Sequence, residues 1–199
     1  METVSVTHLV PTLRQLVNVA LPPLMHTALA QAAQEFCRES GLVRYTREFD
    51  HIEAGSVHAL IGSSALNQSG QGSYLTSEII ALLDENGEPL QKGSHYQSLS
   101  RDVLRFLVPI AHLTLECTVE PLPHSLTLPK VLCDEYGQAV CYGAAHRLLW
   151  QPDSDWHNPT LANEYRQWFI EALRLAKRFQ LESGQRQSFA NPIRCREFF

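Results

Sequence analysis

The sequence of 199 residues lacks the motifs of the common catalytic and metal sites. Its nine histidines form no HxH, no HExxH and no Cys/His cluster with ligand spacing, so no metal site is predicted. Serines lie beside glycine at 61–66 without the GxSxG elbow, and the glycine-rich segment 69–73 lacks the Lys-Ser/Thr pair of a phosphate loop. No acid and base form an evident pair. The expectation is a protein without a cofactor that is not an enzyme.

Long apolar runs and an excess of basic residues are also absent. No apolar run approaches the roughly 18 residues of a membrane span, so no membrane partner is expected. The formal net charge of -5 opposes broad binding to nucleic acid, which requires a dense basic face. The five cysteines are an odd number without CxxC spacing, and no leader-like segment opens the chain. These features predict a soluble protein that folds in a reducing cytoplasm.

The first helical periodicity lies between a double proline and a glycine. Pro22 and Pro23 suit the entry of a helix, and Gly41 suits the left-handed residue after its end, which predicts a helix over 23–40. A shorter helix is expected upstream, from Pro11 to the double proline. On the main helix, Cys37 is interpreted as a small core residue. Its glutamates, like the acids of the later helix, are interpreted as parts of solvated faces: Glu35, Glu39, Asp134 and Glu135.

The middle of the chain, 43–128, changes to strand periodicity. Asn86-Gly87 predicts a tight hairpin turn with positive φ values. The segment 112–120 alternates apolar and polar residues, so Leu113, Leu115, Cys117 and Val119 are expected in the core, with Thr114, Glu116, Thr118 and Glu120 in water. The segment 101–109 fits a helix or a strand equally well.

The C-terminal third returns to helical spacing. A helix beginning near Pro129 carries small residues, predicted to let another helix come close: Gly137, Cys141, Gly143 and Ala144. Asn158-Pro159 predicts the start of a long helix that ends near Ser183-Gly184 and packs through Trp168 and Phe169 within a longer apolar stripe, which runs from Leu161 to Phe179.

The predicted fold class is α+β: a helical bundle built from N- and C-terminal helices, with a β-rich middle insertion and an extended C-terminal arm. Residues 1–184 form one domain, and 185–199 form the arm. The plain interpretation of the arm is a disordered terminus. The alternative is a docking arm, because arginine and phenylalanine anchor interfaces. Its candidate contact residues are Arg186, Phe189, Arg194, Arg196, Phe198 and Phe199.

The order of these segments resembles a known family. The segments "PPLMHTALAQAAQEFCRESGLVRY", a β-rich middle, "LPKVLCDEYGQAVCYGAAHRLL" and "WHNPTLANEYRQWFIEALRLAKR" look like the head-to-tail adaptor (connector) proteins of tailed bacteriophages. The likeness covers most of the chain and rests on order and spacing, since each local motif is weak.

The resemblance implies a structural protein of the virion neck, assembled in the host cytoplasm. Such adaptors form a ring, commonly of twelve copies, between the portal protein and a tail tube or nozzle protein, and viral DNA passes through the ring. An acidic channel wall would let DNA slide without sticking. Two alternatives remain open: a tail-accessory hydrolase acting on cell wall, and a small DNA-binding protein that uses the arm with Arg174, Lys177 and Arg178.

Overall fold

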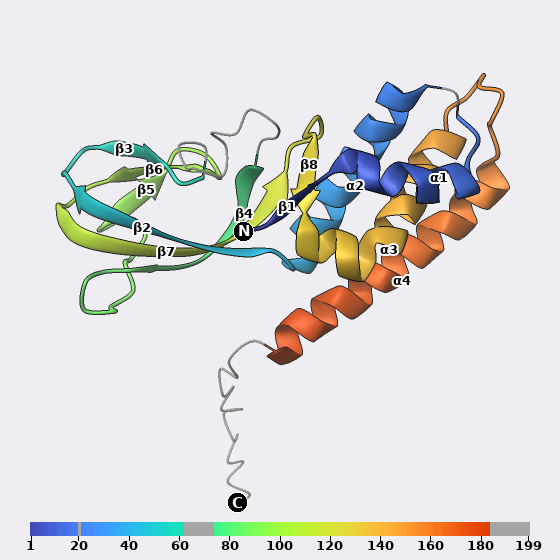
Figure 1. Ribbon diagram of the computed structural model, residues 1–199. Helices are drawn as coiled ribbons and strands as arrows, with labels where there is room; N and C mark the ends of the chain where they lie inside the picture. The colour runs from blue at the N-terminus through green and yellow to red at the C-terminus, as the bar shows by residue number, and fades with distance from the viewer. Residues whose placement is uncertain (20, 62–73, 184–199) are drawn as a thin grey trace, which may run out of the picture.

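The computed structural model describes residues 1–19, 21–61 and 74–183. Helices gather at one end of the molecule and strands at the other, so that the β-rich middle projects from the helical bundle (Figure 1). This arrangement confirms the predicted α+β class. The helices are η1 (Val6–Leu9, a short 3-10 helix), α1 (Val10–Leu16), α2 (Pro22–Ser40), α3 (Lys130–Leu149) and α4 (Pro159–Ser183).

The strands form three antiparallel sheets. The largest has the order β2-β7-β4, a second has the order β3-β6-β5, and β1 pairs with β8. The pair β1-β8 ties the start of the chain to the start of α3, a pairing that the sequence did not indicate. The strands are β1 (Thr3–Ser5), β2 (Arg44–Ile52), β3 (Val57–Ala59), β4 (Tyr74–Leu83), β5 (Tyr96–Ser98), β6 (Val103–Phe106), β7 (Ile110–Pro121) and β8 (Thr127–Pro129).

Both ends of α2 lie where the sequence places them. Pro22 and Pro23 open the helix, where a missing N–H breaks no helical hydrogen bond. Gly41 follows its last residue with φ 64°, and its N–H donates to the carbonyl of Cys37 at 3.0 Å. The side chain of Cys37 is fully buried, as expected of a core residue. The shorter upstream helix α1 is also present, but it ends at Leu16, before the double proline.

The predicted turn at Asn86-Gly87 is present, but the hairpin is short. Gly87 has φ 80°, whereas Asn86 does not have a positive φ; the Asp84 carboxylate accepts hydrogen bonds from the N–H groups of Asn86 and Glu88 at 2.9 and 2.8 Å. The returning chain makes only a brief pairing with β4, through the bridge between Leu83 and Pro89. The long partner of β4 is β7, and the undecided segment 101–109 contains strand β6.

The alternation predicted for β7 holds on its apolar face. On the face predicted to be in water, it fails at the C-terminal end of the strand. All four apolar positions, Leu113 to Val119, are fully buried. Thr118 and Glu120, expected in water, are only 6% and 3% exposed. The Thr118 hydroxyl accepts a hydrogen bond from the N–H of Glu78 at 3.1 Å, beside an irregularity in the pairing of β4. Glu120 lies against α2, where Arg38 and Gln34 donate to it.

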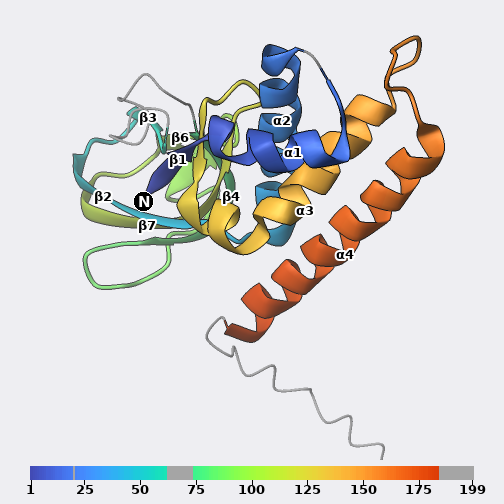
Figure 2. The ribbon, with the colours of Figure 1, turned by 45° about the vertical axis from the view of Figure 1, so that its right-hand side comes forward.

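The helical bundle is α2, α3 and α4 in mutual contact, and α4 runs along α3 for much of its length (Figure 2). The Asn158 side chain accepts a hydrogen bond from the N–H of Leu161 at 3.1 Å, which confirms it as the N-cap. Helix α3 has a kink at Tyr136 (φ -127°, ψ 16°), next to Gly137, a poor helix former. The bundle core and the sheet core form one continuous apolar cluster.

Burial keeps the thiols of the described cysteines protonated. Cys37, Cys117, Cys133 and Cys141 are all free and buried. Burial raises the pKa of Cys117 and Cys133 to about 11 and that of Cys141 to about 12, and it raises the pKa of Cys37 further still. These thiols pack as small apolar groups.

Gly143→Ala should destabilise the protein, although alanine favours a helix. A Cβ at 143 would lie 2.7 Å from two ring atoms of the buried Phe169 and 3.1 Å from Cβ of Ala32. Overpacking of this kind costs about 1–3 kcal/mol, which exceeds the gain of about 1 kcal/mol in helix propensity. The difference is a net loss of up to about 2 kcal/mol in the free energy of unfolding, measured by urea denaturation.

Gly137→Ala is the matched control for that measurement. A Cβ at 137 would lie 3.0 Å from Cδ2 of Leu9, the far end of a flexible side chain. The change should therefore be close to neutral. Equal destabilisation by the two alanines would show that the contact with α4 is not the reason why residue 143 must be glycine.

Candidate interaction surfaces

The predicted packing residues divide between two neighbours of α3. Gly143 faces Phe169 of α4, and both are buried at the centre of the bundle together with Ala144. Gly137 instead faces Leu9, and the thiol of Cys141 donates a weak hydrogen bond to the carbonyl oxygen of Leu9 at 3.6 Å. The small residues of α3 therefore admit α4 on one side and the N-terminal helical segment on another.

Trp168 lies at the edge of the α3–α4 contact and is 50% exposed. Its ring centroid is 5.0 Å from that of Tyr142 on α3 and 5.5 Å from that of Tyr165. Trp168 therefore contacts α3 through Tyr142 while half exposed, whereas its neighbour Phe169 is fully buried. Neighbouring residues of a helix differ by about 100° in direction, and here Phe169 points to the core and Trp168 to its edge.

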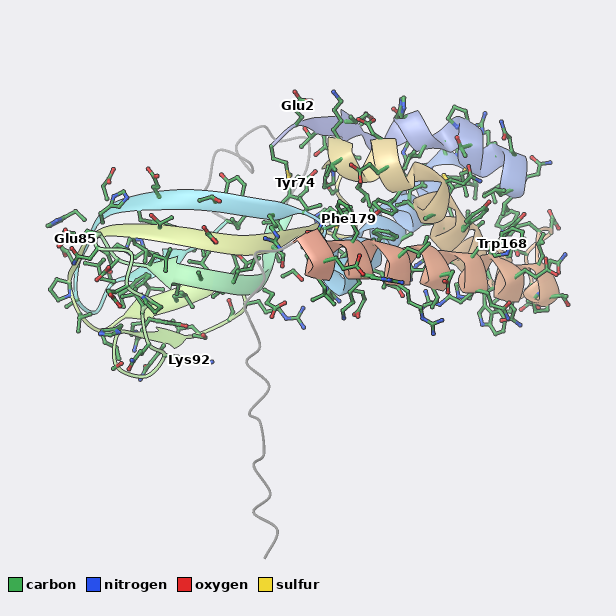
Figure 3. The ribbon with its side chains drawn as sticks, turned by 90° about the horizontal axis from the view of Figure 1, so that it is seen from below. Glu2, Tyr74, Glu85, Lys92, Trp168 and Phe179 are labelled. Carbon is green, nitrogen blue, oxygen red and sulfur yellow. The ribbon has the colours of Figure 1, made fainter. Side chains whose placement is uncertain are left out.

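A partly exposed apolar stripe on α4 lies beside its buried face, with Ala172 packed against the core and the other three residues at least half exposed. Trp168, Ala172, Leu175 and Phe179 recur at spacings of four, three and four residues, which places them on one side of the helix. Leu175 and Phe179 are each 56% exposed. Phe179, also predicted to pack within the bundle, lies toward the end of α4 that adjoins the sheets, while Trp168 lies toward the other end (Figure 3). Spacing of this kind is typical of helix pairing.

A network of ion pairs joins all three helices of the bundle. Glu35 on α2 accepts a hydrogen bond from Arg147 of α3 at 2.7 Å, and the guanidinium of Arg166 of α4 lies 2.7 Å from its other oxygen. The Arg166 guanidinium also lies over the ring of Phe169. The expectation that Glu35 belongs to a solvated face was therefore wrong.

A second ion pair joins α2 to the sheet. Both oxygens of the buried Glu120 accept hydrogen bonds from Arg38, one of them at 2.7 Å, and Gln34 donates to the same carboxylate at 3.1 Å. Gln34, Glu35 and Arg38 lie three or four residues apart in sequence, so they share one side of α2. The polar residues on this side of α2 can be identified from the sequence, but the residues that bind them lie 82 or more positions away in the chain.

The two networks meet in a polar cleft. It has a volume of about 610 Å³ and lies between α2, α3 and α4, next to Pro123. Burial lowers the pKa of His146, which also lines the cleft, and the nearby guanidiniums act in the same direction. Its Nδ1 lies 3.0 Å from the carbonyl oxygen of Ala162, so that nitrogen carries the proton and donates. The lining residues are Gln31, Gln34, Glu35, Arg38, Pro123, His146, Arg147 and Arg166.

Several sequence hypotheses concern residues that lie outside the described ranges or that the described structure does not bring together. The six arm residues, from Arg186 to Phe199, and the segments rich in serine and glycine within 62–73 lie outside the described residues. Within the described ranges, no three His, Cys, Asp or Glu side chains gather as metal ligands, and no helix is long and apolar enough to cross a membrane. Of the three basic residues proposed for DNA, Arg174 pairs with Glu171 and Arg178 with Glu182.

Glu35→Gln should lower stability at neutral pH and have little effect in acid. Burial opposes the charged form of Glu35, but Arg166 and Arg147 outweigh it and hold the pKa of this carboxyl below its ordinary 4.5. The stabilisation is therefore complete above pH 4.5 and is lost as the pH falls through the lowered pKa. We expect a loss of about 1–2 kcal/mol near neutrality.

Urea denaturation of both proteins across this pH range measures the effect. Glu171→Gln on the exposed side of α4 is the control, since an exposed pair contributes less than about 1 kcal/mol. A difference between wild type and Glu35→Gln that stays constant down to strongly acidic pH would contradict the ion-pair explanation.

Comparison of the chain with protein-family models gives no match, and comparison with curated proteins gives none either. A functional assignment therefore depends on the geometry of these surfaces together with the order of the elements along the chain.

Proposed function

We propose that this protein is a head-to-tail adaptor of a tailed bacteriophage. In this role it is a structural component of the virion neck that forms a ring beneath the portal protein and presents a platform to a tail tube or nozzle protein. The observation that carries the proposal is the exposed stripe on α4, Trp168, Ala172, Leu175 and Phe179. On this side of the longest helix in the bundle, Leu175 and Phe179 are each 56% exposed, and Trp168 is 50% exposed at the edge of the α3–α4 contact.

The stripe suits repeated side-by-side contacts between copies in a ring. A heptad-like 4-3-4 spacing is the pattern by which helices pair along their length, and a closed ring of identical contacts leaves no such stripe uncovered. The arrangement of the elements agrees with this role, because the bundle holds α4 along its buried side and the β-rich part projects away from the helices (Figure 1).

The remaining chemistry supports a passive channel component. The formal net charge is -5. In the second half of α4, Arg174 is paired with Glu171 and Arg178 is paired with Glu182. A protein with this balance has little affinity for the DNA that passes through the neck. The arm, with Arg194, Arg196, Phe198 and Phe199, is the segment proposed to dock on the portal.

Removal of the arm should abolish portal binding and leave the fold intact. The experiment is co-sedimentation with portal rings of the same virus, comparing the full chain with a chain cut after Gly184. The full chain should sediment in a fixed ratio with the portal, and the truncated chain should stay in the supernatant with an unchanged circular dichroism spectrum. Absence of binding by the full chain would refute the adaptor proposal.

Polar substitutions in the α4 stripe should prevent ring formation without unfolding the monomer. Leu175→Gln with Phe179→Gln removes the two most exposed residues of the stripe, and because both are exposed, stability should change by only about 0.5 kcal/mol for each. The mass of the portal complex should then fall below that of the complete ring. Leu99→Gln, at a residue 52% exposed between β5 and β6, is the matched control and should leave the mass unchanged. A full complement of copies in the α4 variant would exclude the stripe from the ring contact.

A further inference from the structure

The polar cleft holds more positive charge than its own carboxylates neutralise. Three guanidiniums line it, those of Arg38, Arg147 and Arg166, while Glu35 and Glu120 are the carboxylates paired with them. Among these five groups one positive charge is left over, and Glu39, which also acts on Arg38, lines a different pocket. His146 does not change this balance near neutral pH, because burial lowers its pKa and favours the neutral ring.

Each of the three arginines keeps N–H groups that its carboxylate does not occupy. A guanidinium has five N–H donors. Among the described residues, Arg147 and Arg166 each approach Glu35 through one nitrogen, and Arg38 approaches Glu120 through two. All three side chains are between 35% and 40% exposed, so the remaining donors are accessible to a molecule in the cleft.

The arginines come from three different helices, so their guanidiniums reach the cleft from more than one of its walls. Arg38 belongs to α2, Arg147 to α3 and Arg166 to α4. A carboxylate offers two oxygens in one plane, whereas a phosphate offers oxygens in a tetrahedral arrangement that several guanidiniums can reach from different directions. The cleft volume of about 610 Å³ exceeds that of a phosphate alone and leaves space for the group that carries it.

We propose that this cleft is a binding site for a phosphate group. The buried Glu120 fixes Arg38 at one side, and Glu35 holds Arg147 and Arg166 at the other. The phosphate binds to the outward donors of all three guanidiniums, with the side-chain amide of Gln31 as a further donor in the lining. The site does not depend on the adaptor role, and its test uses the purified protein alone.

The proposal predicts opposite changes in phosphate affinity for substitutions of the glutamate and of an arginine in this network. Glu35 competes with an incoming phosphate for Arg147 and Arg166, so Glu35→Gln should increase phosphate affinity several-fold. Arg166→Gln removes one of the three guanidiniums and should lower the affinity about tenfold, the effect of one strong charge-assisted contact. A purely structural network would lose stability in both variants and change phosphate binding in neither.

Titration calorimetry with inorganic phosphate and pyrophosphate, at constant ionic strength, measures these affinities. Arg174→Gln is the control, because Arg174 is on the exposed side of the same helix, paired with Glu171, and carries the same charge. Its affinity should equal that of the wild type. Arg166→Lys keeps the charge and loses the planar fork, so its affinity should lie between those of wild type and Arg166→Gln. If Arg166→Gln folds poorly, the lower affinity of Arg166→Lys relative to wild type still tests the site.

Two further ligands identify the source of the phosphate and its competitors. A short DNA duplex that binds with the same order of variants, where inorganic phosphate does not, assigns the group to a nucleic-acid backbone and supports the site. Binding of acetate or glutarate as tight as that of phosphate would overturn the proposal. So would equal affinity in all the variants, or no binding of any phosphate-bearing ligand.

Discussion

The close approach of three helices at Gly143 is the constraint on which the rest of the structure depends. Phe169 of α4 and Ala32 of α2 both meet α3 at this point, leaving no space for a side chain on residue 143. Phe169 in turn packs edge-on against Phe36, with ring centroids 5.8 Å apart. The position of α4, and with it the direction of its exposed stripe, therefore follows from one missing Cβ.

The same close packing explains why charged groups gather between the helices. Once α2, α3 and α4 are in contact, Glu35, Arg147 and Arg166 come together at the boundary of the apolar core. A half-buried carboxylate is costly unless it is paired, and two guanidiniums supply the pairing. The bundle thus has two distinct surfaces beside its core: an apolar stripe on α4 suited to another protein surface, and a polar cleft with a surplus of guanidinium donors. They serve separate proposals and are open to separate tests.

Local signals in the sequence predicted the elements well, and distant contacts account for what it missed. The ends of α2, the Asn158 cap and the buried face of β7 follow from residues adjacent in the chain. The burial of Glu120 depends on Arg38, which lies 82 residues away, and no periodicity within β7 reports it. The same holds for the partners of Glu35.

The exposed stripe shows a different limit. A single apolar stripe from Leu161 to Phe179 was predicted, yet α4 has two apolar sides, one facing α3 and one facing solvent. Both contribute to the same sequence pattern, and only the position of Phe169 against Gly143 separates them. Phe179 was therefore placed in the bundle although it lies on the second side, and Trp168, which contacts Tyr142 of α3, lies at the boundary between the two sides.

Electron cryomicroscopy of the purified protein mixed with portal rings tests the central claim most directly. The adaptor role predicts a closed ring of copies beneath the portal, with the α4 stripe of each copy covered by its neighbour. A map in which the portal is bare, or in which bound copies leave Leu175 and Phe179 facing solvent, would contradict the account.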